Sequence, residues 1–282
     1  MSSSPSVMRA RSFNKTPFLF VTLALLAGFA LVAFLVAALA VRPRTSSSVG
    51  AERARRLSSL PPVILWAWER PEKLDYLDTR RVGVAFLART LHLRGESVVV
   101  RPRLQPLQVA PDASLVAVVR IESDKSEPPT LSEVQRARTV EAIVALKEKR
   151  AVRAIQIDFD ATVSERDFYR QLLFDVRRAL PGDLALSMTA LASWCMHDDW
   201  LRDLPVDEAV PMLFRMGADE RQVRHQLRAG AGFRPPVCRA SLGVSTDEPF
   251  AFELARPARL YVFHPRSWSS ESVRQILERH PQ

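Results

Sequence analysis

The 282-residue chain has few cysteines and lacks the short motifs that mark several common enzyme classes. Its two cysteines, Cys195 and Cys238, stand far apart without the paired spacing of zinc ligands. The G-x-S-x-G, H-E-x-x-H and glycine-rich phosphate-loop patterns are also missing. We therefore expect no metal and no cofactor. The two thiols are either buried and free or, if the domain is exported, joined as a disulfide.

Acidic residues are missing from the first 41 positions, and charge of either sign is missing from Pro17 to Val41. This apolar run exceeds the roughly 20 residues that cross a bilayer as a helix. Arg9, Arg11 and Lys15 precede it, and the positive-inside rule keeps such a basic head in the cytoplasm. The pattern predicts a cytoplasmic head over 1–16 and a transmembrane helix over 17–41.

Two other interpretations of the apolar segment stay open. Ala38-Leu39-Ala40 has the small-x-small form of a signal-peptide cleavage site, and a buried helix of a soluble protein is also apolar. Residues 42–61 are rich in Ser, Arg and Pro without an apolar period, which predicts a linker. An uncleaved anchor makes this a single-pass inner-membrane protein whose domain, residues 62–282, is periplasmic or extracellular.

The net charge of +9 does not indicate a nucleic-acid partner. Part of that charge belongs to the basic head, and the other basic residues are mostly arginines scattered among acids. Because the sequence has no basic stripe with interleaved aromatic residues, we expect no binding of nucleic acid.

Short β-rich runs alternate with helical patterns along the domain, which predicts an α/β fold with a parallel sheet. Eight strands are expected, at Val63–Trp68, Ser97–Arg103, Leu115–Glu122, Ala154–Asp160, Leu184–Ala190, Ala209–Met216, Arg239–Ser245 and Arg259–His264. Helices are expected at Thr79–Arg94, Leu131–Arg150, Ser164–Leu180, Ala218–Gly230 and Ser269–Arg279. Eight strands in roughly 240 residues favour an irregular (β/α)8 TIM-like barrel. A doubly wound open sheet is the alternative.

The expected strand Ala154–Asp160 ends in two acidic residues. Since side chains alternate along a strand, its odd-numbered residues should pack against helices, while Gln156, Asp158 and Asp160 should point into the barrel. Two carboxylates this close raise one pKa, which suits general acid catalysis. We expect Asp160 to hold the proton and Asp158 to stay charged.

Other polar and aromatic residues at strand ends should face the same mouth of the barrel. The candidates for substrate binding are Trp66, Trp68, Glu69, Arg120, Glu122, Gln156, Ser187, Thr189, Trp194 and His264. Aromatic rings beside carboxylates suit sugars, although Trp66 also fits a core position and Arg120 and Glu122 a mutual ion pair. His197-Asp198-Asp199 is expected to be a solvated helix start rather than a metal site.

The same fourth strand resembles the Gly-Ile-Asp-Ile-Asp-Trp-Glu motif of the family-18 chitinases. The likeness places Asp160 where that family has its acid, and Asp158 where it has the Asp that orients the substrate's acetamido group. Gln156 stands in place of the first Asp of the motif, and Asp160 is one methylene shorter than the family's Glu.

A closer resemblance is to an uncharacterised bacterial family of glycosidase-like barrel domains, covering most of Pro62–Pro281. That family has a Trp-x-Trp-like first strand, a Q-x-D-x-D fourth strand and an L-S-x-T-A-L-x-S-W fifth strand. They match Trp66 to Trp68, Gln156 to Asp160 and Leu186 to Trp194. The resemblance implies a glycoside-hydrolase-like domain whose partner is carbohydrate, such as cell-envelope glycan. A non-catalytic glycan-binding or envelope-assembly protein on the same scaffold is the alternative.

Overall fold

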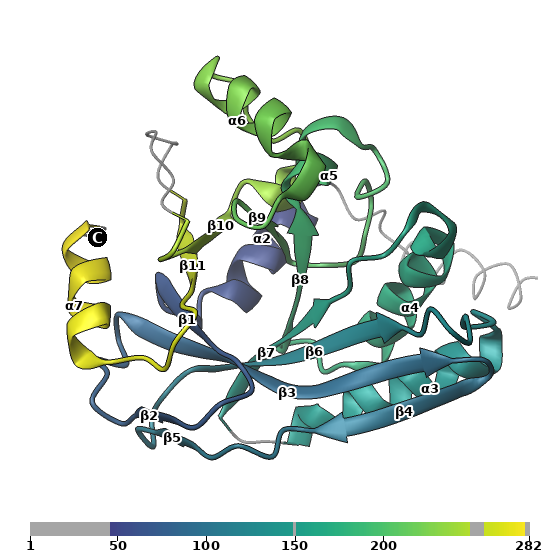
Figure 1. The fold of residues 1–282 in the computed structure, drawn as a ribbon, viewed down its shortest axis with the longest axis horizontal. Helices are drawn as coiled ribbons and strands as arrows, with labels where there is room; N and C mark the ends of the chain where they lie inside the picture. Colours follow the sequence, from purple (N-terminus) through teal and green to yellow (C-terminus); the bar gives the residue numbers. More distant parts are fainter. Residues whose placement is uncertain (1–45, 149–150, 249–256, 280–282) are drawn as a thin grey trace, which may run out of the picture. The chain divides into compact units, whose positions relative to one another are not determined.

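The computed structural model describes residues 46–148, 151–248 and 257–279. The predicted basic head and transmembrane helix lie outside these residues. Within the described ranges, no helix is both long and apolar enough to span a membrane. The chain divides into two compact units, Met1–Val49 and Gly50–Gln282, and the second contains the fold shown in Figure 1.

Eight parallel strands form a closed barrel in the second unit (Figure 1). In order around the barrel they are β1 (Val63–Ala67), β3 (Val82–Arg94), β6 (Leu115–Ser123), β7 (Val152–Asp158), β8 (Ala185–Leu191), β9 (Glu208–Met212), β10 (Ser241–Ser245) and β11 (Arg259–Phe263). Strand β1 closes the barrel because it pairs with β3 on one side and β11 on the other. The α/β class and the TIM-like barrel are confirmed, and the open sheet is wrong.

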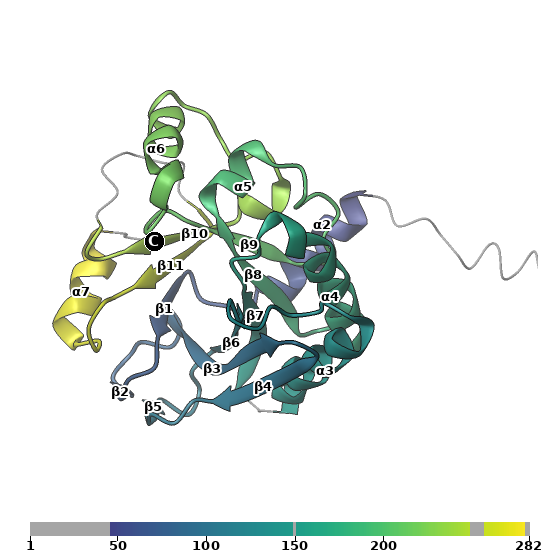
Figure 2. The ribbon, with the colours of Figure 1, turned by 45° about the vertical axis from the view of Figure 1, so that its right-hand side comes forward.

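The second barrel strand does not lie where the sequence pattern places it. Strand β3 occupies the range predicted as a helix, and β4 (Ser97–Pro102), predicted as a barrel strand, pairs antiparallel with β3 outside the barrel (Figure 2). Residues 82–88 of β3 are all buried, so they lack the polar alternation of a half-exposed strand. Gly95, at a φ of 48°, lies in the β3–β4 turn rather than ending a helix.

Most predicted helices are confirmed: α3 (Glu133–Val144), α4 (Arg166–Ala179), α6 (Glu220–Arg228) and α7 (Ser270–Arg279). Helix α2 (Ser46–Leu57) lies within the range predicted as a linker. Helix α5 (Ala192–His197) ends at His197, so the prediction that a helix starts there is wrong. The short strands β2 (Glu72–Leu74) and β5 (Leu107–Val109) pair with each other outside the barrel. The 3₁₀ turns are η1 (Ala145–Glu148), η2 (Val163–Glu165), η3 (Gly217–Asp219) and η4 (Pro236–Cys238).

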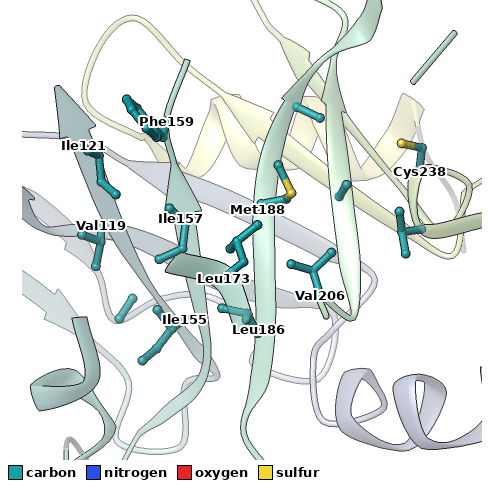
Figure 3. Packing of buried hydrophobic residues seen from close by; sticks show 14 of the residues in the cluster. Val119, Ile121, Ile155, Ile157, Phe159, Leu173, Leu186, Met188, Val206 and Cys238 are labelled. Carbon is teal, nitrogen blue, oxygen red and sulfur yellow. The ribbon is translucent and has the colours of Figure 1, made fainter. Parts of the chain in front are cut away.

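Strand β7 has two differently packed faces, as its alternation predicts. Ile155, Ile157 and Phe159 are buried in the apolar layer that includes Leu173 of α4 (Figure 3). The inward-facing Ala154 belongs to a separate apolar cluster inside the barrel. The carboxylates that follow on the inner face are therefore presented to the interior of the barrel.

A buried ion pair lies at the N-terminal ends of the strands. Arg259, the first residue of β11, donates to Glu208 Oε2 at 3.0 Å, and Tyr261 donates to the other oxygen at 2.5 Å. Arg259 also donates to the carbonyl of Leu57 at 2.8 Å, which ties the end of α2 to the barrel. Both charges are almost fully buried and paired, as buried charges must be.

Cys195 and Cys238 form a disulfide, with Cα atoms 6.0 Å apart. The bond joins α5 to η4 and closes the loop that contains β9 and α6. Of the two alternatives that the sequence left open, free thiols or a disulfide, the structure has the disulfide.

Candidate active site

A cavity of about 450 Å³ is lined by residues at the C-terminal ends of the barrel strands. This end of a parallel barrel is where active sites form, and the volume is within the range of small-ligand sites. One part of its lining is polar and charged: Arg120, Glu122, Asp158, Asp160 and Thr189. The rest is mainly aromatic and apolar, and Arg215 also lines it.

Arg120 lies at the centre of the charged side chains. Because β6 and β7 are parallel and in register, Arg120 is paired with Asp158 on the neighbouring strand, and Arg120 Nη1 donates to Asp158 Oδ2 at 2.7 Å. Arg120 Nε donates to Glu122 Oε1 at 2.7 Å, and Nη2 lies 4.0 Å from Asp160 Oδ2. Burial lowers the pKa of Arg120, but the neighbouring carboxylates outweigh this effect and keep it raised. Arg120 is therefore a permanent cation.

The two aspartates have different surroundings. Asp158 is buried, and both its oxygens accept hydrogen bonds, one from Arg120 and the other from Thr189 Oγ1 at 2.8 Å. Asp160 lies two residues further on, and its side chain is 49% exposed. Burial and the charge of Asp158 raise the pKa of Asp160 despite the opposing effect of Arg120. Asp160 therefore keeps its proton to a higher pH than a free aspartate does.

A neutral hydrogen-bonded chain lies inside the barrel below the charged residues. Trp66 Nε1 donates to Gln156 Oε1 at 2.9 Å, and Gln156 Nε2 donates to Ser187 Oγ at 3.1 Å. Gln156 and Ser187 are fully buried and do not line the cavity, so substrate contact predicted for them is not supported. Trp66 does line it, while its ring packs 5.4 Å from that of Tyr261. Trp66 therefore belongs both to the apolar core of the barrel and to the lining of the cavity.

Aromatic rings form much of the remaining lining. Phe214 and Phe263 stack with centroids 5.6 Å apart and planes at 12°. Trp68 also lines the cavity, and the guanidinium carbon of Arg120 lies 6.0 Å from the centroid of its ring. Sequence analysis missed Phe214, Arg215 and Phe263. The available signal was their position at or just beyond the ends of β9 and β11.

Besides Gln156 and Ser187, three further predicted site residues lie outside the lining of the cavity: Glu69, Trp194 and His264. Glu69 Oε1 accepts from the backbone N–H of Leu104 at 3.1 Å. His264 Nδ1 lies 2.6 Å from Thr246 Oγ1, and burial lowers its pKa. Trp194 is buried edge-on against Trp200. The described parts of the chain hold no group of three or more His, Cys, Asp or Glu that could bind a metal.

Comparison with known proteins gives one family and one similar structure. Residues 112–210, which contain β6, β7 and β8, match the profile of a family described as "Domain of unknown function (DUF3142)". This match confirms the resemblance to an uncharacterised family. The chain is also similar to a Streptomyces coelicolor protein provisionally assigned as chitinase A, with 9% identity over 77% of this chain and 95% of that chain, and a TM-score of 0.49. No curated protein matches.

Proposed function

We propose that the barrel domain binds carbohydrate in this cavity and hydrolyses glycosidic bonds. Asp160 acts as general acid toward the leaving oxygen, and Asp158 is its charge partner. The observation that carries the proposal is a half-exposed carboxyl of raised pKa beside a buried, fully paired carboxylate. Trp68 offers a flat apolar face to a sugar ring in the same cavity, and Phe214 and Phe263 add apolar lining.

The contacts of Asp158 and Asp160 suit the two carboxylates to different roles. Asp158 has both oxygens engaged by hydrogen-bond donors, so it is better suited to hold charge than to attack a substrate. Asp160 reaches the cavity, and once it gives up its proton Arg120 stabilises the resulting carboxylate. Glu122 is the third carboxylate of the lining and the next candidate for proton transfer. Glu69 is a weaker candidate because its carboxylate caps backbone N–H groups elsewhere.

We also propose that residues 17–41 anchor the protein in the inner membrane and that the barrel works outside the cytoplasm. The charge-free apolar run supports the anchor. The disulfide between Cys195 and Cys238 supports the location, since disulfides persist mainly in oxidising compartments.

A non-catalytic glycan-binding or envelope-assembly protein is the second candidate. One observation favours it: Arg120 contacts all three cavity carboxylates and opposes the rise in the pKa of Asp160. A barrel of this kind does not by itself decide between the two functions.

A glycan panel offered to the purified full-length protein tests the proposal. Cleavage is followed by the release of reducing ends, and binding by calorimetry. The enzyme hypothesis expects turnover of at least one glycan in the parent. Binding without turnover would favour the second candidate, and the absence of both would contradict a carbohydrate function.

A further inference from the structure

Arg215 brings a second cation to the cavity, from a different part of the barrel than the acidic cluster. It follows β9, whereas Glu122 lies on β6, Asp158 ends β7 and Asp160 follows β7. Its guanidinium carbon lies 4.6 Å from the centroid of the Phe263 ring. Over the ranges that the structure describes, no carboxylate forms an ion pair with this guanidinium, in contrast to Arg120 with its three acidic neighbours.

The backbone of Arg215 is held in a conformation that few side-chain-bearing residues adopt. Its φ is 51°, in the left-handed region, and its N–H donates to Glu248 Oε2 at 2.9 Å. Such strain is typical of functional sites, where the surrounding structure maintains it. Here the backbone bond and the contact with Phe263 fix the place of the guanidinium. The ring occupies one face of the guanidinium, while the N–H groups at its edge can still bind a ligand.

We propose that Arg215 binds a carboxylate on the sugar, so that the substrate is an acidic glycan rather than a neutral one. This inference rests on the proposed carbohydrate function and names the substrate class of that site. A planar guanidinium fork matches a carboxylate through two parallel hydrogen bonds. The cavity then contains a proton donor, Asp160, and an anion-binding side chain, Arg215. The stacked rings of Phe214 and Phe263 lie beside Arg215.

The test compares glycans that differ only in charge, bound to the full-length protein. One probe is peptidoglycan glycan strands stripped of peptide, whose lactyl groups carry carboxylates. The second is tetragalacturonic acid, which carries its carboxylates on the sugar ring. Each is offered as the free acid and as its methyl ester, and chitohexaose serves as an uncharged glycan. The two acids distinguish a lactyl from a uronic carboxylate.

We expect at least one acid to bind the parent about tenfold or more tightly than its ester, the scale of a charge-assisted hydrogen-bond pair. Arg215→Gln should reduce that preference to less than about threefold. Arg101→Gln is the matched control, because Arg101 is exposed on β4 and outside the cavity lining. Melting of each variant shows whether it is folded.

Two results would overturn the inference: no preference of the parent for either acid over its ester, or a preference that survives Arg215→Gln. The parent comparison holds even if the variant fails to fold. Binding of chitohexaose or of the esters, without any preference for the acids, would contradict the inference of an acidic substrate but leave the proposed carbohydrate function standing. Failure of every glycan to bind would contradict the carbohydrate function itself.

Discussion

At the scale of single residues, the position of Arg120 decides what each carboxylate of the cavity can do. It is bound to Asp158 at 2.7 Å and stays at 4.0 Å from Asp160, so one aspartate is fixed and the other has freedom to act. Sequence alternation was sufficient to find both aspartates and Arg120, because residues on one face of neighbouring strands converge. It could not find Arg215, which depends on a turn after β9.

The raised pKa of Asp160 predicts how stability depends on pH. A carboxyl whose folded pKa lies above its unfolded pKa is destabilising once it ionises, so its cost is absent at low pH and grows as pH rises through the folded pKa. Asp160→Asn removes that cost. We expect the variant to melt at or above the parent's temperature at pH 7, with the difference vanishing below about pH 3.9, the unfolded pKa. A lower melting temperature at pH 7 would show that ionised Asp160 is stabilising.

At the scale of elements, prediction succeeded where one face of a segment is buried and the other is polar. Helix α4 places Phe168, Leu172 and Val176 on one buried stripe, and its range was predicted well. The sequence of strand β3 predicts a helix, because burial on both faces removes the polar alternation of a half-exposed strand. Glu69 and Trp194 follow the ends of strands, which predicts that they face the cavity. They lie elsewhere, because the direction of the chain beyond a strand end depends on contacts distant in sequence.

The two-faced packing of β7 predicts a large effect of a charge on its outer face. Ile157 is fully buried among apolar side chains, so Ile157→Asp buries a carboxylate without a partner. We expect a loss of several kcal/mol in the free energy of unfolding, measured by chemical denaturation. Val134→Asp, at a position 55% exposed, is the control and should change stability little. An Ile157→Asp variant as stable as the parent would contradict the packing of β7.

The disulfide predicts a second effect on stability. Cys195 and Cys238 are separated by 43 residues, and closing such a loop restricts the unfolded chain by roughly 4 kcal/mol in the loop-entropy estimate. Cys195→Ser with Cys238→Ser should therefore lower the denaturant midpoint, and reducing agent should no longer affect it. Equal midpoints for the parent with and without reducing agent would show that the bond is not formed or not stabilising.

At the scale of the whole molecule, the number and order of the expected strands were enough to predict a closed barrel. They were not enough to predict the register of the strand pairs or the location of the cavity. The count was right even though one predicted strand, Ser97–Arg103, belongs to a hairpin outside the barrel. The pairing of β1 with both β3 and β11 is a property of the folded chain, because it joins residues from both ends of the domain. The acid pair at the end of β7 was foreseeable, but the aromatic and cationic lining at the ends of β9 and β11 was not.

Membrane topology is the whole-molecule property most open to direct measurement. The charge-free run from Pro17 to Val41, preceded by a basic head, predicts that all residues beyond Arg42 are exported. A reporter active only in the periplasm, fused after Gln282, should be active, and a cytoplasmic reporter at the same place should be silent. The reverse result would show that the barrel faces the cytoplasm.

The central claim is that Asp160 donates the proton in glycoside cleavage. Its most direct test is the turnover rate of Asp160→Asn on a glycan that the parent cleaves, measured across pH beside Asp158→Asn. General acid catalysis is worth about 10²–10⁴ in rate, so Asp160→Asn should lose at least that much while still binding the glycan. Parent activity should fall as pH rises through the raised pKa of Asp160. Unchanged turnover in Asp160→Asn would contradict the account and move the proton donor elsewhere, with Glu122 the first to test.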